Sequence, residues 1–202
     1  MQLLLVRHGC CGSEHSQRFI GASDPDLSEI GRQQVAALTA QWNAQKSQRC
    51  FCSPLKRCRQ TAAPLADALR LKIEIEADLR EIDFGRWEGL TFEEIAVADP
   101  EIVKQWADFT PGFRFPGGES LKDFLARVDR VITRLTAADD AVLVVTHGGV
   151  IRTTICHLLG LSPRQYVLFD VKPTSLVTIN VCHGKGVLAG LNEPLITANE
   201  RE

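Results

Sequence analysis

Two short apolar runs, far apart in this chain, each end in a histidine followed by a glycine. Gln2 to Val6 continues as Arg7-His8-Gly9, and Ala141 to Val145 continues as Thr146-His147-Gly148. Continuous apolar runs with β-branched residues are typical of strands that are covered on both faces, as in a parallel sheet. The two runs therefore predict two buried strands that end in polar, potentially reactive side chains.

Strands and helices alternate along the rest of the chain. Ser28 can cap a helix that runs to about Ala44, and Ser120 can cap a strongly amphipathic one. The other predicted elements are strands at Arg49 to Ser53 and Lys72 to Glu76, a helix that begins near Pro54, a helix after Gly149 and a hairpin over Leu176 to Leu191. This alternation predicts an α/β fold in which a mostly parallel sheet carries helices on both faces, as three α/β/α layers.

The length of 202 residues suits one sizeable core, so we expect a single domain over residues 1–202. Its middle, about 84–119, is interrupted by glycines and prolines, which predicts loops with one or two short helices. We expect this inserted segment to cover the substrate and, over about Phe92 to Phe115, to set specificity. Four aromatic residues there would either line an apolar pocket or form a local core: Trp106, Phe109, Phe113 and Phe115.

Charge and cysteine content narrow the class of protein. The net charge is −2 with both signs interspersed, so we expect no nucleic-acid surface, and any bound anion should be held by a local cluster. No apolar stretch approaches the roughly 18 residues of a membrane span, and the N-terminus lacks a cleavable export signal. We therefore expect a cytoplasmic protein. Seven cysteines, an odd number, are expected to be free thiols.

The ends of three predicted strands bring together groups that suit a phosphate. In open α/β sheets ligands bind outside the carboxyl ends of the strands, so His8 and His147 should face one crevice. Arg57 should lie in the first turn of the helix after the third strand, where the helix dipole also favours an anion. With Arg7, these groups match a dianionic phosphoryl group. One imidazole could then attack phosphorus and form a phosphohistidine.

Such a reaction needs a proton donor for the leaving alkoxide. Glu81 is flanked by apolar residues, which favours the protonated form of a carboxyl group. Asp83 and Glu88 are alternatives on the same grounds, and spacing alone does not separate the three.

These motifs together resemble the histidine phosphatase superfamily, also called the phosphoglycerate mutase-like family. The matching stretches, in chain order, are Arg7 to Gly9, Gly21 to Gly31, Ser53 to Ala62, Leu79 to Gly89, Pro116 to Ser120 and Thr146 to Arg152. The resemblance implies a phosphoglycerate mutase-like fold with His8 as the phosphorylated nucleophile. It further implies that Arg7, Arg57 and His147 bind the phosphate, that His147 stabilises the transition state, that Glu81 donates the proton, and that no metal or cofactor takes part.

The chain departs from many relatives just after the nucleophile, where it carries Cys10, Cys11 and Glu14. We treat Glu14, Arg18 and Gly21 as candidate substrate contacts. Among the members of the family, the short length and the Phe84 to Gly89 segment look most like α-ribazole 5′-phosphate phosphatases, which act in cobalamin biosynthesis. The expected partner is therefore a small phosphomonoester, with α-ribazole 5′-phosphate first. The alternatives are a broad-specificity sugar or nucleotide phosphatase and a phosphoglycerate mutase.

Two hypotheses of other kinds also follow from the sequence. A metal-binding or redox module would draw on the histidine and cysteines near the first and second strands: Cys10, Cys11, His15, Cys50, Cys52 and Cys58. They lack the paired CxxC spacing of zinc sites, which disfavours this hypothesis. A weaker version of the redox hypothesis is that Cys10 or Cys11, near cationic groups, has a depressed pKa and oxidises. An edge strand or the closing hairpin could also join two copies as a homodimer.

Overall fold

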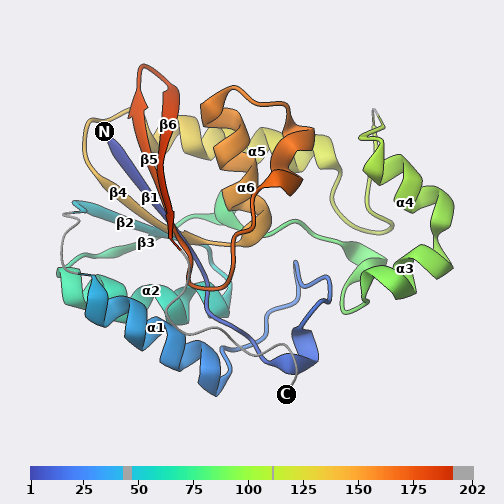
Figure 1. The fold of residues 1–202 in the computed structure, drawn as a ribbon, viewed down its shortest axis with the longest axis horizontal. Coiled ribbons are helices and arrows are strands. Elements are labelled where there is room, and N and C mark those ends of the chain that lie inside the picture. The colour runs from blue at the N-terminus through green and yellow to red at the C-terminus, as the bar shows by residue number, and fades with distance from the viewer. Residues whose placement is uncertain (43–46, 111, 193–202) are drawn as a thin grey trace.

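A six-stranded mixed sheet forms the centre of the molecule. The structure, a computed structural model, describes residues 1–42, 47–110 and 112–192 (Figure 1). Within these residues the strand order is β3-β2-β4-β1-β5-β6. The strands are β1 (Gln2–Arg7), β2 (Arg49–Cys52), β3 (Ile73–Ile75), β4 (Val142–Thr146), β5 (Leu176–Cys182) and β6 (Lys185–Asn192). Strands β1 to β4 run parallel to one another. β5 is antiparallel to its neighbours β1 and β6. The mostly parallel sheet is therefore confirmed.

Helices cover both faces of this sheet. In Figure 1, α1 (Glu29–Gln41) and α2 (Lys56–Leu69) lie on one side, and α5 (Leu121–Leu135) and α6 (Gly148–Leu159) lie on the other. The described residues also contain four short 3₁₀ helices: η1 (Ser13–His15), η2 (Ala77–Leu79), η3 (Gly85–Trp87) and η4 (Pro163–Leu168). The predicted three-layer arrangement is therefore confirmed.

The side chains of β1 alternate between two cores. Leu3 and Leu5 belong to the core under α5 and α6, whereas Leu4 and Val6 belong to the core under α2. All four are completely buried, and burial of each such side chain contributes about 1.5–3 kcal/mol. This burial on both faces explains why the strand reads as a continuous apolar run.

Element boundaries differ from the sequence prediction by a few residues. Ser28 caps α1 by accepting from Gly31 N, as expected, but the helix ends at Gln41, and the predicted end at Ala44 lies outside the described residues. The helix expected from Pro54 begins at Lys56, because Leu55 still has an extended backbone. Ser120 caps α5 by accepting from Asp123 N at 3.0 Å.

The segment 84–119 contains two short helices, as predicted. They are α3 (Phe92–Ala98) and α4 (Pro100–Ala107), which Figure 1 shows at one end of the molecule, away from the sheet. Asp99 joins them and accepts from the indole N–H of Trp87 at 2.7 Å. Edge-to-face aromatic contacts continue from Trp87 to Trp106 and Phe115, at centroid distances of 5.8 and 5.5 Å. The segment is therefore a small aromatic unit joined to the core that contains Leu3 and Leu5.

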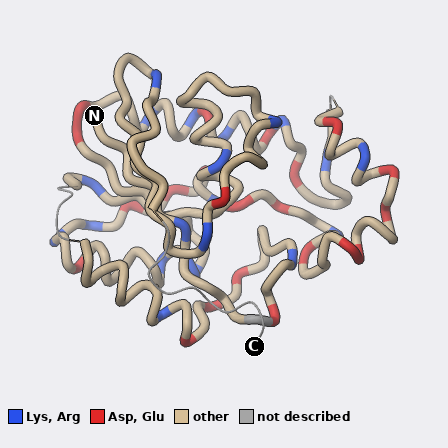
Figure 2. Tube along the Cα trace, in the orientation of Figure 1, with Lys and Arg blue, Asp and Glu red and all other residues tan. Residues whose placement is uncertain are grey.

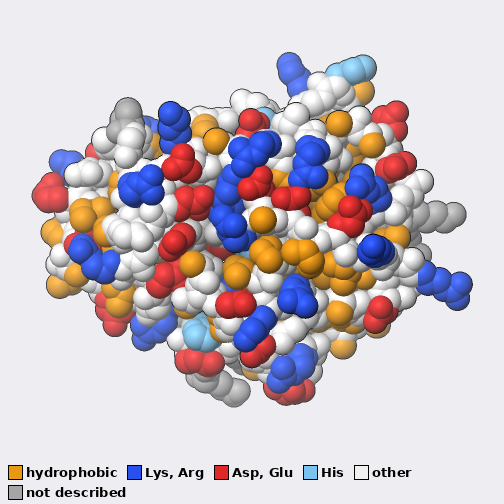
Figure 3. Space-filling model, turned by 180° about the vertical axis from the view of Figure 1, so that it is seen from behind, with side chains coloured by type: hydrophobic (Ala, Val, Ile, Leu, Met, Phe, Trp, Pro, Cys, Tyr) orange, Lys and Arg blue, Asp and Glu red, His pale blue; other side chains and the backbone are white. Residues whose placement is uncertain are grey.

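Acidic and basic residues alternate over the surface. Figure 2 shows no long stretch of one sign along the trace, and on the face seen in Figure 3 Lys and Arg lie directly beside Asp and Glu. Among the described residues, no helix is long and apolar enough to cross a membrane.

Candidate active site

Neighbouring strands place the two histidines side by side. β1 and β4 are paired so that Arg7 lies opposite Thr146, and His8 N donates to Thr146 O at 3.0 Å. The next residue of each strand is a histidine, and the ring centroids of His8 and His147 lie 5.2 Å apart. The two imidazoles thus lie side by side at the strand ends, as predicted, but both are buried and neither lines the pocket described below.

Hydrogen bonds fix the tautomer of His8. Its Nδ1 lies 2.8 Å from the carbonyl oxygen of Gly9, and a carbonyl can only accept, so Nδ1 carries the proton. Arg57 Nε donates to His8 Nε2 at 3.3 Å. Nε2 therefore carries the lone pair of the ring, which accepts from Arg57, and this is the tautomer a nucleophilic imidazole needs.

Both histidines are held neutral. Burial lowers the pKa of His8 well below 6.5, and the charges of Arg57 and Arg7 lower it further. Burial likewise lowers the pKa of His147, followed by the charges of Arg57 and of a protonated His8. The Ser53 hydroxyl lies 2.8 Å from His147 Nε2 and adds a polar contact inside this buried site.

Arg57 is completely buried and joins the loop of residues 20–23 (the 20–23 loop) to the nucleophile. Besides its bond to His8, its Nη1 donates to Ser23 O at 2.6 Å and its Nη2 donates to Gly21 O at 2.9 Å. The loop is held from its other side by the Glu88 carboxylate, which accepts from the backbone N–H of Gly21, Ala22 and Ser23. Arg57 is therefore fixed in place before any ligand arrives.

Arg7 has a buried N–H without a partner. Its Nη1 donates to Val171 O at 2.6 Å, whereas its Nε is buried and has no hydrogen-bond partner among the described residues. A Cβ atom placed on Gly148 would lie 3.5 Å from the guanidinium carbon of Arg7, so this group sits against the start of α6. A buried unpaired donor is costly, and Arg7 also lines the pocket described below.

Glu81 is bound at the start of α6. Its Oε2 accepts from Gly149 N at 2.9 Å, and its Oε1 accepts from Ile82 N at 3.1 Å. The other two candidate acids are occupied elsewhere, because Glu88 binds the 20–23 loop and Asp83 accepts from Gly85 N at 2.8 Å. Of the three carboxylates, Glu81 alone lines the pocket described below.

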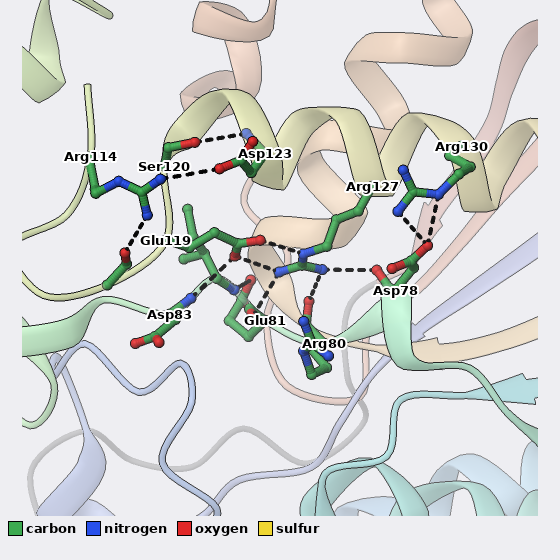
Figure 4. A network of polar contacts seen from close by, with 12 residues as sticks. Asp78, Arg80, Glu81, Asp83, Arg114, Glu119, Ser120, Asp123, Arg127 and Arg130 are labelled. Carbon is green, nitrogen blue, oxygen red and sulfur yellow. Dashed lines mark hydrogen bonds and ion pairs between the residues drawn. The ribbon is translucent and has the colours of Figure 1, made fainter. Parts of the chain in front are cut away.

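A buried ion pair fixes the segment that carries Glu81 (Figure 4). Arg127 of α5 binds both carboxylate oxygens of Glu119, at 2.7 and 2.8 Å. The same guanidinium donates to the carbonyl oxygens of Asp78, Arg80 and Glu81 at 2.7–3.0 Å. One side chain thus binds three backbone carbonyls within residues 78–81 and fixes the position of the backbone that carries Glu81.

A pocket of about 300 Å³ opens beside Arg7 and Glu81. Its apolar wall comes from the loop before α1 and from the inserted segment and includes Phe19, Phe84, Trp106, Phe109 and Phe115. η4 closes another side, where the ring of Tyr166 lies 5.8 Å from that of Phe109. Of the four aromatic residues that the sequence left open, Trp106, Phe109 and Phe115 line the pocket. Phe113 does not line it and is buried in the core, with its ring 5.0 Å from that of Phe115.

The three candidate substrate contacts are placed differently from one another. Arg18 lines the pocket and donates to Gly89 O at 2.7 Å. Gly21 does not line it, and its small size serves packing, because a Cβ there would lie 1.9 Å from Ile82 O. The Glu14 side chain is 68% exposed, lies 3.7 Å from His15 Nε2, and is absent from the pocket lining.

The cysteines give no support to a reactive or metal-binding role. Burial raises the pKa of Cys11 to about 11 and that of Cys50 to about 12. The expectation of a depressed pKa is therefore wrong for Cys11, because desolvation outweighs the nearby Arg57 and Arg7. In the described part of the chain, no three His, Cys, Asp or Glu side chains gather where they could hold a metal ion.

Sequence reasoning missed two arginines of this site. Arg127 lies three residues after Phe124 and four before Val131, on the buried stripe of α5, and a charge on such a stripe is a signal that could have been used. Arg152 closes the Thr146 to Arg152 motif and lies one helical turn after Gly148. It lines the pocket, and its Nε is buried without a partner among the described residues.

Relatives of this chain include several phosphatases. It is 31% identical to phosphoserine phosphatase 1 of Hydrogenobacter thermophilus, over 95% of this chain and 92% of that protein. It is 42% identical to a bifunctional protein of Mycobacterium tuberculosis over 72% of this chain, and spans about 41% of the length of that protein. The structure of the α-ribazole phosphatase from Shigella flexneri superimposes with a TM-score of 0.85, at 26% identity, covering 98% of this chain and 99% of that one.

The match to a family covers nearly the whole chain. Residues 3–194 match the histidine phosphatase superfamily (branch 1), and this range includes both histidine-bearing strands, Arg57 and Glu81. The α/β fold, the two neighbouring histidines and this match all indicate the same family. The chain belongs to the histidine phosphatase superfamily.

Proposed function

We propose that this protein is a metal-independent phosphomonoesterase that works through a phosphohistidine on His8. The observation that carries this proposal is the neutral His8 imidazole, whose Nε2 lone pair is held by Arg57 at the meeting point of two strand ends. Arg7, Arg57 and the two imidazoles stabilise the negative charge of the phosphoryl group, a role that a metal ion has in other phosphatases. Membership of the family and the phosphatase names of its relatives support the same activity.

Substrate binding places the phosphoryl group between His8 and the arginines. Arg7 Nε has no partner among the described residues and is free to donate to a phosphoryl oxygen. Arg57 Nε donates to His8 Nε2, and once phosphorus takes that lone pair the same N–H can donate to a phosphoryl oxygen while Nη1 and Nη2 keep their bonds to the 20–23 loop. Charge-assisted hydrogen bonds of this kind are strong and directional. The site therefore orients phosphorus opposite Nε2 before the reaction starts.

In the first step, His8 Nε2 forms a bond to phosphorus and the ester P–O bond breaks. Protonated Glu81 transfers its proton to the leaving oxygen, so the alcohol departs neutral. His147 and the arginines stabilise the charge on the equatorial oxygens. In the second step, water attacks the phosphohistidine, the Glu81 carboxylate takes the proton of that water, and the P–N bond breaks to release phosphate.

The test of this activity is phosphate release from phosphomonoesters in the presence of EDTA. Wild-type protein should turn over, and His8→Ala should lose at least about 10³-fold in kcat because the nucleophile is gone. Wild type quenched with denaturant at alkaline pH, which preserves the P–N bond, should carry phosphate on His8, detected by mass spectrometry at alkaline pH. Turnover by His8→Ala at the wild-type rate, or activity that depends on added metal, would overturn the proposal.

Two substrate classes have specific support. The first is α-ribazole 5′-phosphate, which the sequence predicts and for which the aromatic wall of Phe19, Phe109 and Tyr166 offers a surface for a flat ring system. A solved relative bears the name α-ribazole phosphatase. The second is a phosphomonoester that carries a carboxylate, like the substrate in the name of the phosphoserine phosphatase relative. Arg152 favours this second class, since α-ribazole 5′-phosphate has no anionic group besides its phosphate.

A further inference from the structure

Arg152 is a pocket arginine that the proposed reaction does not use. It lies in the second turn of α6, five residues after His147, and lines the same pocket as Arg7 and Glu81. Its Nε is buried and has no hydrogen-bond partner among the described residues. A buried guanidinium donor that stays unpaired costs free energy, so a group that pairs with it would bind favourably.

Arg152 lies close to the phosphate site but is separate from it. Gly148 packs against the guanidinium of Arg7, and Arg152 is four residues later on the same face of α6, about 6 Å farther along the helix axis. The two positive charges interact, because after burial the charge of Arg152 is the largest cause that lowers the pKa of Arg7. Two neighbouring cations in one pocket favour a ligand with negative charge at two places.

Besides Arg7, whose unpaired Nε is assigned to the phosphoryl group, the other charged residues that line the pocket already have partners. Arg18 is paired with Glu94 at 3.2 Å and with Gly89 O at 2.7 Å. Glu81 accepts from two backbone N–H groups. Within the residues that the structure describes, Arg152 is thus a pocket cation that no carboxylate neutralises.

We propose that Arg152 binds a carboxylate on the leaving group of the substrate, so that the protein acts on phosphorylated hydroxy acids or hydroxy amino acids. This inference rests on the proposed phosphatase function. A single guanidinium matches the single charge of a carboxylate and can bind both of its oxygens, whereas the dianionic phosphoryl group meets two arginines and two imidazoles. Arg152 lies one helical turn beyond Gly148, which packs against Arg7. This separation between the two arginines suits a substrate whose carboxylate is attached to the carbon next to the ester-bearing carbon.

The experiment compares substrates that differ in this carboxylate. O-phosphoserine is paired with phosphoethanolamine, and 3-phosphoglycerate with glycerol 3-phosphate, and α-ribazole 5′-phosphate is measured beside them. Wild type should prefer the carboxylated member of each pair by about ten- to a hundredfold in kcat/KM, the range of one charge-assisted pair. Arg152→Met should bring both ratios to within about threefold of one.

A matched control removes an arginine outside the pocket. Arg59 is exposed on α2 and is absent from the pocket lining, so Arg59→Met makes the same change in charge and side chain. It should keep the wild-type preference in both pairs. Arg152→Lys, which keeps the charge and loses the planar fork, should show an intermediate ratio.

Binding to a variant without turnover separates this inference from the proposed function. In His8→Ala, calorimetry should show tighter binding of O-phosphoserine than of phosphoethanolamine, and His8→Ala/Arg152→Met should remove the difference. A wild-type preference of one or less, or an equal loss on both members of a pair in Arg152→Met, would overturn the role of Arg152. Absence of turnover on all five compounds, with this binding difference intact, would instead overturn the proposed phosphatase function.

Discussion

Replacing Arg127 by methionine should destabilise the protein and misplace Glu81 at the same time. The side chains of Arg127 and Glu119 are only 6% and 16% exposed, and their two parallel hydrogen bonds are accompanied by three bonds from Arg127 to backbone carbonyls. Arg127→Met leaves the Glu119 carboxylate buried and unpaired.

The magnitude follows from this burial. Removing one partner of a buried ion pair costs about 3–5 kcal/mol, and each kcal/mol lowers the Tm of a protein of this size by about 2–4 °C. Arg127→Met should therefore lower Tm by roughly 6–20 °C. Arg130→Met is the matched control, since Arg130 lies one turn along α5 and binds Asp78 with 64% of its side chain exposed. An exposed pair contributes about 0–1 kcal/mol, so this variant should lose only a few degrees.

Calorimetry and steady-state kinetics measure the two effects. At a temperature where Arg127→Met remains folded, kcat should fall by at least about tenfold, because a displacement of the catalytic group by about 1 Å costs up to about 100-fold. Arg127→Met/Glu119→Leu should recover part of the lost Tm, since no buried charge is then left unpaired. The reasoning is refuted if Arg127→Met and Arg130→Met lose the same few degrees, or if folded Arg127→Met keeps the wild-type kcat.

Three further predictions concern pH, packing and oxidation. Because burial lowers the pKa of His8 and His147 in the folded state, the unfolded chain binds more protons once pH falls below about 6.5, and the unfolding free energy should then drop by up to about 1.4 kcal/mol per pH unit for each histidine. Denaturant unfolding across this range should show it, and an unchanged slope in His8→Gln would contradict it. Gly21→Ala should cost about 1–3 kcal/mol and lower kcat/KM by displacing the loop that holds Arg57, whereas Gly190→Ala, where a Cβ meets only one atom at 3.6 Å, should not. Peroxide should leave activity unchanged at neutral pH because the thiol of Cys11 is protonated, and protection by Cys11→Ser would show otherwise.

The parts of the site that sequence predicts are those fixed by local pattern and topology. An apolar run marks β1 and β4, and the carboxyl ends of neighbouring parallel strands share one edge, so His8 and His147 must meet. Arg57 follows in the same way from the start of α2. The α/β layering and the two short helices of the segment 84–119 are predicted on equally local grounds.

The rest depends on contacts between segments that are distant in sequence. Glu81 is distinguished from Glu88 by what each binds, the start of α6 in one case and the 20–23 loop in the other. The high pKa of Cys11 reflects burial, which spacing to the arginines does not reveal. The unpaired state of Arg152 is a property of the whole pocket lining, so it appears only in the folded structure.

The place of β1 in the sheet has a consequence for synthesis of the chain. β1 pairs only with β4 and β5 in the described sheet, and more than 130 residues separate it from β4. At ribosomal rates of about 5–20 residues per second, that interval lasts roughly 7–26 s. Throughout it, the Leu3 to Val6 strand has neither edge paired, and an unpaired apolar strand of this kind attracts other chains and is recognised by chaperones. The segment that carries the nucleophile thus emerges long before the two strands that protect it.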